Sequence, residues 1–197
     1  MRWLTGRGVV AALAVGIATA WGMGWRGVLL LLAFFVSGSL LNRSPRDAGG
    51  RRNERQVIAN GGVAALAALA GSWPAFAGSL AAATADTWAT EIGQHSRTPP
   101  RLITNGRPVP AGTDGGITLL GAAAGIAGAG FVALLTLLWQ RPAAIPVTCA
   151  GIVGMLLDSV LGATVQGAFR WLDNDAVNLA TTCSGAIIAL VLARLCC

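Results

Sequence analysis

Long apolar stretches occupy most of this chain. Crossing a bilayer takes about 20 mostly apolar residues, and seven stretches reach or approach that length, at roughly 8–22, 27–41, 57–73, 75–93, 115–139, 145–165 and 176–195. Only 11% of the 197 residues are charged, against roughly 25% in soluble domains. The pattern excludes a disordered chain, a protein that coats nucleic acid and most soluble enzymes. It predicts an all-α, polytopic transmembrane bundle of about seven helices, forming a single domain over residues 1–197.

The positions of the arginines predict how this bundle is oriented. All 14 basic residues are arginine. If the N-terminus is cytoplasmic and all seven stretches span, every arginine except Arg26, Arg141 and Arg194 lies on the cytoplasmic side. Because basic residues favour cytoplasmic loops, we expect an integral membrane protein with a cytoplasmic N-terminus. The run Ala18-Thr19-Ala20 also resembles a signal-peptide cleavage site, and cleavage there would leave the downstream orientation unchanged.

The acidic residues gather on the same side. With this orientation all eight lie in cytoplasmic loops or in the cytoplasmic halves of helices. Asp86 and Asp158 fall inside predicted helices, where a carboxylate costs about 2.5–3.5 kcal/mol to insert, and neither helix contains an arginine. The compensating charge must come from a loop arginine, a proton or a bound cation. The structural alternative is a buried carboxyl group that is hydrogen-bonded to a neighbouring helix.

Carboxylates beside arginine-rich loops suit a Mg²⁺ ion that holds a polyphosphate, because Mg²⁺ binds carboxylate and phosphate oxygens. The candidate metal ligands are Asp86, Asp114 and Asp158. Glu91 could complete the shell if its helix is distorted near Gly93. The positions of these acidic residues therefore predict a site for a metal ion and a polyphosphate that faces the cytoplasm.

Residues 94–114 are predicted to form a cytoplasmic substrate loop that contains three arginines and four prolines. We expect Gly115-Gly116 to begin a long helix, whose free N–H groups and dipole favour phosphate. Thr113 and Asp114 could equally serve as helix N-caps. The candidate phosphate ligands in this region are Arg101, Arg107, Thr113, Gly115 and Gly116.

The chain also contains a candidate internal repeat. NGGVAALAALAG (60–71) and DGGITLLGAAAG (114–125) share six of twelve residues, and both are expected to begin a helix. The helices that follow return with Asp86-Thr87 and Asp158-Ser159. We interpret 57–93 and 115–166 as two parallel helical hairpins whose acidic ends meet, with two N-terminal helices in 1–41 and a last helix at 176–195.

Four sequence runs resemble the signature blocks of one membrane family. They are ADTWATEIG (85–93), PRLITNGRPVPAGTDGGITLLG (100–121), LLDSVLGATVQG (156–167) and DNDAVNLATT (173–182), and RQVIANGGVAA (55–65) matches as well. The family is that of phytyl-phosphate kinase and transmembrane protein nineteen, formerly described as domain of unknown function 92. The CTP-dependent phytol and dolichol kinases are more loosely similar. Ala111 stands where those kinases have Glu, which favours the phosphate-accepting branch.

The resemblance implies an enzyme that uses CTP to phosphorylate an isoprenyl monophosphate, of phytyl or geranylgeranyl type, to the diphosphate at the cytoplasmic face. The implied partners are a nucleoside triphosphate, an isoprenoid phosphate and membrane lipid, and the implied cofactor is Mg²⁺. No nucleic acid is expected to bind. The resemblance is also compatible with a homo-oligomer. We assign catalytic roles to Asp86, Glu91, Asp114 and Asp158. The polar residues expected to contact the nucleotide or phosphates are Asn60, Asp175 and Asn178.

Two other enzyme activities and one other class of membrane protein, a transporter, stay open at this point. A lipid-alcohol kinase or a CTP-using cytidylyltransferase would use the same groups. Intramembrane carboxylates also mark the ion paths of proton- or cation-coupled transporters. A transporter has its site near the bilayer midplane, whereas the outer halves of these helices contain no acid. This favours a site that is open to one side.

Overall fold

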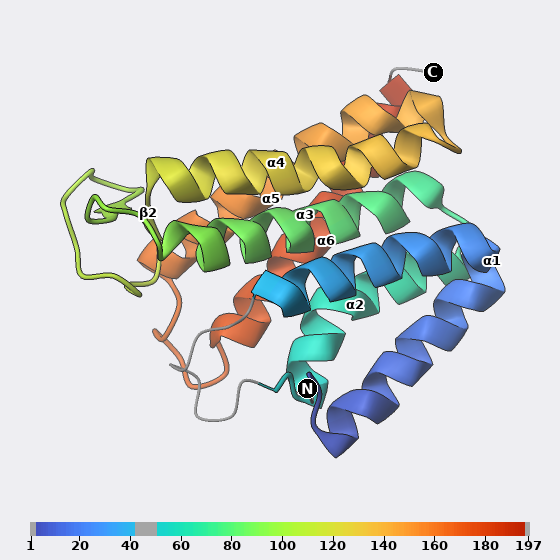
Figure 1. Cartoon of the computed structure of the whole chain (residues 1–197), viewed down its shortest axis with the longest axis horizontal. Helices are drawn as coiled ribbons and strands as arrows, with labels where there is room; N and C mark the ends of the chain where they lie inside the picture. The colour runs from blue at the N-terminus through green and yellow to red at the C-terminus, as the bar shows by residue number, and fades with distance from the viewer. Residues whose placement is uncertain (1–2, 42–50, 196–197) are drawn as a thin grey trace.

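The computed structural model describes residues 3–41 and 51–195, which form a bundle of six α-helices with one small pair of strands (Figure 1). The helices are α1 (Gly6–Leu41), α2 (Glu54–Leu69), α3 (Trp73–Gly93), α4 (Leu119–Leu137), α5 (Ala144–Thr164) and α6 (Asn174–Leu195), with a 3₁₀ turn at Arg141–Ala143 before α5. The strands β1 (Arg101–Leu102) and β2 (Gly116–Ile117) pair antiparallel. The predicted helical class is confirmed.

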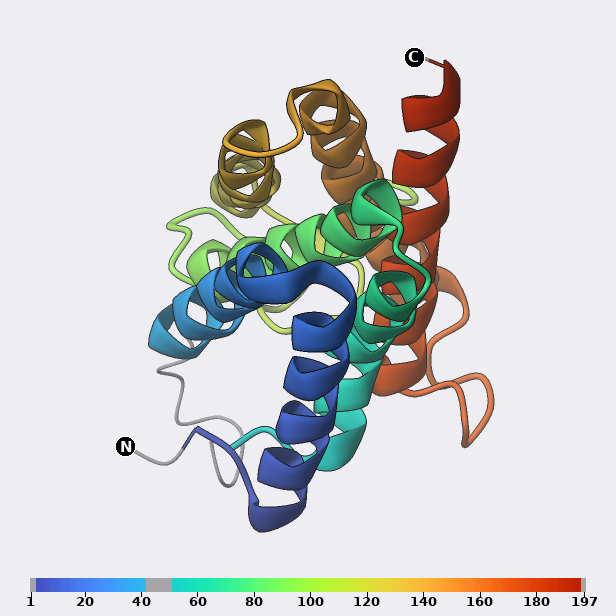
Figure 2. The ribbon, with the colours of Figure 1, turned by 90° about the vertical axis from the view of Figure 1, so that its right-hand side faces the viewer.

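The two N-terminal segments are the arms of one broken helix. Gly24 has φ 63° and ψ −161° inside α1, a conformation that glycine adopts without steric cost. The chain therefore folds back at this point, as the blue ribbon shows in two perpendicular views (Figures 1 and 2). We call residues 6–23 the first arm of α1 and residues 25–41 its second arm.

Helix α3 is the centre of the bundle and contacts each of the other five helices. Its residues 75–85, most of them alanine, are all buried. Glycine at the crossing with α6 lets the two backbones touch. A methyl group on Gly78 would lie 2.5 Å from the carbonyl oxygen of Gly185, and one on Gly185 would lie 2.6 Å from that of Gly78. Small residues therefore hold the helices close together, as in other membrane bundles.

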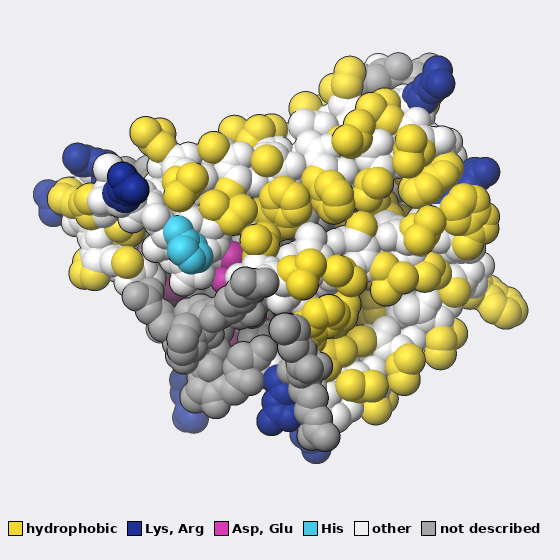
Figure 3. Space-filling view, viewed as in Figure 1, with side chains coloured by type: hydrophobic (Ala, Val, Ile, Leu, Met, Phe, Trp, Pro, Cys, Tyr) yellow, Lys and Arg dark blue, Asp and Glu magenta, His cyan; other side chains and the backbone are white. Residues whose placement is uncertain are grey.

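Four of the described helical segments are long and apolar enough to cross a membrane: α1, α4, α5 with its preceding turn, and α6. Helix α2 has only 16 residues, and α3, with 21 residues, is not among these four. The expected count of seven spanning helices is therefore not confirmed. Apolar side chains cover much of the face in Figure 3, and arginines lie at its edges. The protein is a polytopic helical membrane protein.

Helix α4 begins later than the sequence indicated. Gly115 has a positive φ of 72°, and Gly116 belongs to β2. Thr118 is the N-cap, because its side-chain oxygen accepts the N–H of Gly121 at 2.9 Å. The prediction that Gly115-Gly116 begins the helix is wrong, as is N-capping by Thr113 or Asp114. The tight turn has a packing reason, since a methyl group on Gly115 would lie 2.5 Å from the backbone nitrogen of Ala163.

The start of α2 also differs from expectation. Asn53 and Gln56 form a reciprocal capping box, which satisfies two backbone N–H groups and begins the helix at Glu54. Asn60 therefore lies inside α2, whereas its aligned counterpart Asp114 precedes α4. The expectation that both aligned runs begin a helix is wrong, and the two-hairpin repeat stays a prediction.

Candidate active site

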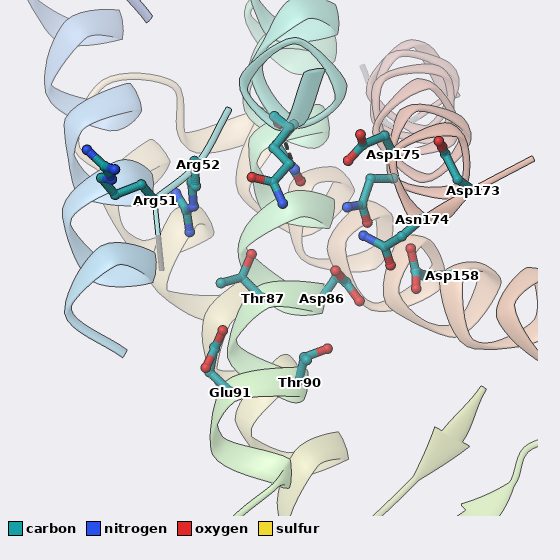
Figure 4. Close-up of a pocket in the computed structure, with 13 residues that line it drawn as sticks. Arg51, Arg52, Asp86, Thr87, Thr90, Glu91, Asp158, Asp173, Asn174 and Asp175 are labelled. Carbon is teal, nitrogen blue, oxygen red and sulfur yellow. Dashed lines mark hydrogen bonds between the residues drawn. The ribbon is translucent and has the colours of Figure 1, made fainter. Parts of the chain in front are cut away.

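A polar pocket of about 500 Å³ opens at one end of the bundle (Figure 4). It lies where the C-terminal halves of α3 and α5 meet the first turns of α2 and α6. All its lining residues are polar or charged: Arg51, Arg52, Gln56, Asn60, Asp86, Thr87, Thr90, Glu91, Asp158, Asp173, Asn174, Asp175 and Asn178. In the view of Figure 3, acidic side chains are visible only in a recess near the histidine. The pocket is thus a polar chamber within an otherwise apolar bundle.

Two carboxyl groups from adjacent helices meet in this pocket. Asp86 of α3 and Asp158 of α5 point toward one another (Figure 4), near enough for their charges to interact. The Oδ2 atom of Asp158 also accepts a hydrogen bond from the hydroxyl group of Thr181 on α6 at 3.1 Å. Two neighbouring ionised carboxylates repel each other, and a proton or a cation between them removes the repulsion. The pair is therefore built to receive positive charge.

Arg52 supplies a fixed positive charge on the opposite wall. Its backbone is held between Trp3 and Thr5, donating to the carbonyl of the first at 2.9 Å and accepting the N–H of the second at 3.0 Å. Its guanidinium carbon lies 5.9 Å from the ring centres of both Phe34 and Phe35. Burial lowers the pKa of this guanidinium, and the negative charge of Glu91 acts in the opposite direction. Arginine stays protonated at neutral pH even so.

The first turn of α6 forms the outer wall of the pocket. Asp173 caps this helix by accepting the N–H of Ala176 at 3.1 Å, and its Oδ2 atom lies 2.7 Å from Arg55. The hydrogen bond from Ala176 and the charge of Arg55 hold the pKa of Asp173 below its ordinary value. Asp175 also pairs with Arg55, at 3.5 Å. Both acids therefore have protein partners that fix the wall in place.

Half of the residues that the sequence indicated line this pocket. They are Asn60, Asp86, Glu91, Asp158, Asp175 and Asn178. The other half do not line it: Arg101, Arg107, Thr113, Asp114, Gly115 and Gly116. These belong to the segment between α3 and α4, which forms its own turn-and-strand structure.

Hydrogen bonds within this segment occupy side chains that were expected to bind phosphate. A guanidinium nitrogen of Arg101 donates to the carbonyl of Gly106 at 2.8 Å, and the hydroxyl of Thr113 donates to that of Pro110 at 2.8 Å. Asp114 lies beside α5 beyond Asp158, since a methyl group on Gly162 would be 3.6 Å from its Cβ. Within residues 3–41 and 51–195, no three His, Cys, Asp or Glu side chains are arranged to hold a metal ion. The charge of Asp114 nevertheless acts on Asp158, so the predicted set of Asp86, Asp114 and Asp158 stays a prediction.

Sequence reasoning missed seven of the pocket residues: Arg51, Arg52, Gln56, Thr87, Thr90, Asp173 and Asn174. Two of them had a usable signal. The Asn-x-x-Gln spacing of a capping box places Gln56 in the first turn of a helix. Thr90 stands four residues after Asp86, and residues at this spacing share one helix face. Arg52 has no such local signal, because its backbone bridge to residues 3–5 depends on the tertiary fold.

Comparisons with known proteins place the chain in a family. The profile described as integral membrane protein DUF92 matches residues 1–186. The chain belongs to this family. This confirms the family that the signature runs indicated.

Relatives of known sequence cover nearly all of the chain. An uncharacterized membrane protein of Methanocaldococcus jannaschii is 34% identical, with 97% of this chain and 86% of the relative aligned. One of Synechocystis is 33% identical, over 95% of this chain and 81% of the relative. The Arabidopsis thaliana protein VTE6, chloroplastic, is 28% identical, over 96% of this chain and 65% of the relative. No solved structure matches.

Proposed function

We propose that this protein is a membrane kinase that transfers the γ-phosphoryl group of CTP to an isoprenyl monophosphate. An oxygen of the monophosphate attacks the γ-phosphorus, the bond to the β-phosphate oxygen breaks, and CDP leaves as the diphosphate lipid forms. The observation that supports this most is the pair of facing carboxyl groups, Asp86 and Asp158, in a polar pocket inside an apolar bundle. Family membership supports an isoprenyl monophosphate as the acceptor, because the resemblance to phytyl-phosphate kinase implies an acceptor of this class.

The donor chemistry of the pocket fits Mg²⁺. This ion takes oxygen ligands, keeps several waters and is commonly bound through one or two carboxylates together with substrate phosphates. Asp86 and Asp158 would hold it, and a third protein acid such as Asp114 is not needed. When bound, the ion offsets negative charge on the phosphate oxygens.

The remaining pocket residues have roles that follow from their charges and positions. Phosphoryl transfer depends mainly on positioning and charge neutralisation. Arg52 faces the acids across the pocket (Figure 4) and would hold phosphate oxygens, in place of Arg101 and Arg107, which do not line it. The amide groups of Asn60 and Asn178 would orient the nucleotide or the acceptor. A monophosphate acceptor is already ionised at neutral pH, so its attacking oxygen has no proton to lose.

The placement of the pocket supports a cytoplasmic site. It lies at the end of the bundle where Arg51, Arg52 and Arg55 precede or begin α2. Basic residues accumulate on the cytoplasmic side of membrane proteins. The proposed enzyme would therefore take CTP from the cytoplasm and its lipid from the bilayer.

The test is to incubate purified protein with labelled CTP, Mg²⁺ and a panel of prenyl alcohols and prenyl monophosphates, and to identify products by mass spectrometry. The proposal expects a prenyl diphosphate from the monophosphates. It also expects Asp86→Asn and Asp158→Asn each to lower turnover at least about a hundredfold, as loss of a main electrostatic contact does. Glu54→Gln is the matched control, because Glu54 pairs with Arg7 outside the pocket.

Other results of this test would contradict the proposal or identify a different function. Near wild-type turnover in both aspartate variants would overturn the role of the carboxyl pair. Phosphorylated alcohols would identify a lipid-alcohol kinase, and a lipid carrying CMP would identify a cytidylyltransferase. Ion flux in proteoliposomes without turnover of any nucleotide would identify a transporter.

A further inference from the structure

A second cavity, apolar and about 470 Å³ in volume, lies between the two arms of α1 and the start of α2. Leu13, Gly16 and Ile17 line it from the first arm, and Leu31 and Phe35 line it from the second. The break at Gly24 creates this groove, because it turns the second arm back toward the first. A chain of hydrocarbon is the kind of ligand that such walls accommodate.

The groove is open to the outside of the bundle. Leu13 is 60% exposed and Ile17 is 69% exposed, although both are large and apolar. They lie on α1, a helix long and apolar enough to span a membrane. A lipid can therefore enter the groove sideways from the bilayer without crossing water.

The groove and the polar pocket are adjacent, because Arg52, Gln56 and Asn60 line both of them. A molecule whose tail lies in the groove and whose head extends past these three residues would meet the pocket that contains Asp86 and Asp158. Arg52 marks the junction with a positive charge, which selects an anionic head over a neutral or cationic one.

We infer that this groove binds the hydrocarbon chain of a lipid monophosphate, with the phosphate beside Arg52 at the mouth of the polar pocket. This rests on the proposed function for the identity of the acceptor, and it adds where the chain of that acceptor lies. Gly16 lines the groove. A methyl group on Gly16 would meet no atom within 4 Å, so a larger side chain there begins in open space and would occupy part of the groove.

The experiment measures binding without CTP, so that it does not depend on catalysis. The variant is Gly16→Phe, and the matched control is Gly130→Phe on α4, where an added methyl group also meets no atom within 4 Å. Affinity of Gly16→Phe for geranylgeranyl monophosphate should fall about tenfold, which is what excluding about two methylene groups from an apolar site costs. Affinity for dimethylallyl monophosphate should change less than twofold, because its short chain does not reach Gly16.

A second readout locates the chain directly. Geranylgeranyl monophosphate carrying a photoreactive group at the far end of its chain should cross-link to residues 9–35 of the wild-type protein, and excess unlabelled geranylgeranyl monophosphate should compete. Cross-links on α4 or α5, an equal loss of affinity in Gly130→Phe, or a loss that is independent of chain length would overturn the inference. Equal labelling by the corresponding alcohol would also overturn it, since the groove would then not select phosphate. Labelling of the groove without kinase turnover would contradict only the proposed function.

Discussion

The hydrogen bond from Thr181 to Asp158 offers a sharp test of the carboxyl pair. Thr181 lies on α6, is 1% exposed, and its hydroxyl group donates to the Oδ2 atom of Asp158 at 3.1 Å. Replacing it by valine keeps the shape of the side chain and removes only the donor. The variant Thr181→Val should therefore leave Asp158 in place but without the group that orients its oxygen.

The size of the effect follows from the kind of bond that is lost. A hydrogen bond to a charged group contributes about 1.5–3 kcal/mol. If all of this free energy is lost from the stabilisation of the transition state, turnover falls roughly 10- to 150-fold. Because Asp158 is a proposed Mg²⁺ ligand, the Mg²⁺ concentration that gives half-maximal turnover should rise as well. Thr181→Ser keeps a hydroxyl group, so its turnover and its Mg²⁺ dependence should both stay close to those of the wild-type protein.

The assay is turnover of prenyl monophosphate with labelled CTP over a range of Mg²⁺ concentrations, with melting temperature measured on the same samples. Thr136→Val is the matched control. The hydroxyl of Thr136 is equally buried but donates only to the carbonyl of Val132 on its own helix, at 2.9 Å. If folded Thr181→Val turns over within twofold of Thr136→Val, with the same Mg²⁺ dependence, the reasoning about Asp158 is refuted.

Three further outcomes are expected. Arg52→Gln should raise the KM for the phosphate substrates about tenfold or more, because it removes a charge-assisted contact to phosphate; steady-state kinetics measures this. Gly185→Ala should lower the free energy of unfolding by about 1–3 kcal/mol, since its methyl group would press on the α3 backbone; thermal unfolding in detergent measures this. Asp173 has a lowered pKa in the folded protein, so its ionised form stabilises the fold above the unfolded pKa of about 3.9. That contribution is lost as the pH falls through the folded pKa, and Asp173→Asn should weaken the dependence of melting temperature on pH in this acidic range.

Each of these has a control on the same chain. Arg141→Gln removes an arginine at the other end of the bundle and should leave KM unchanged. Gly130→Ala adds a methyl group to open space and should not lower stability. A melting temperature of Asp173→Asn that still follows the wild-type pH curve would show that other acids control acid unfolding.

Much of the fold could be read from the sequence because it depends on local composition. The apolar runs predicted the helices to within a few residues at most ends, since a run of this length and character has few other stable forms in a membrane. The same reading failed at Gly115-Gly116, where glycine serves a tight turn against α5 rather than a helix start. It also failed at Asn53 and Gln56, whose capping box extends α2 further toward the N-terminus than the apolar run does.

The candidate site was only partly predictable for a different reason. Asp86 and Asp158 were identifiable alone, because a carboxyl group inside an apolar helix is costly and needs an explanation. That the two face each other, and that Thr181 of α6 binds one of them, depends on how α3, α5 and α6 pack. Asp114 was grouped with them by charge and apparent repeat, yet its turn leaves it outside the pocket.

The membrane class, the helical composition, the family and the two acids that most need a partner were all predictable from the order of the residues alone. These follow from the cost of placing particular residue types in an apolar medium, which each segment incurs independently of the others. Which charges meet depends on how the helices pack. Arg52 reaches the pocket through a backbone bridge to residues far away in the chain, and the apolar groove exists because α1 breaks at Gly24 and folds back. Both depend on contacts between distant segments, and no local pattern encodes them.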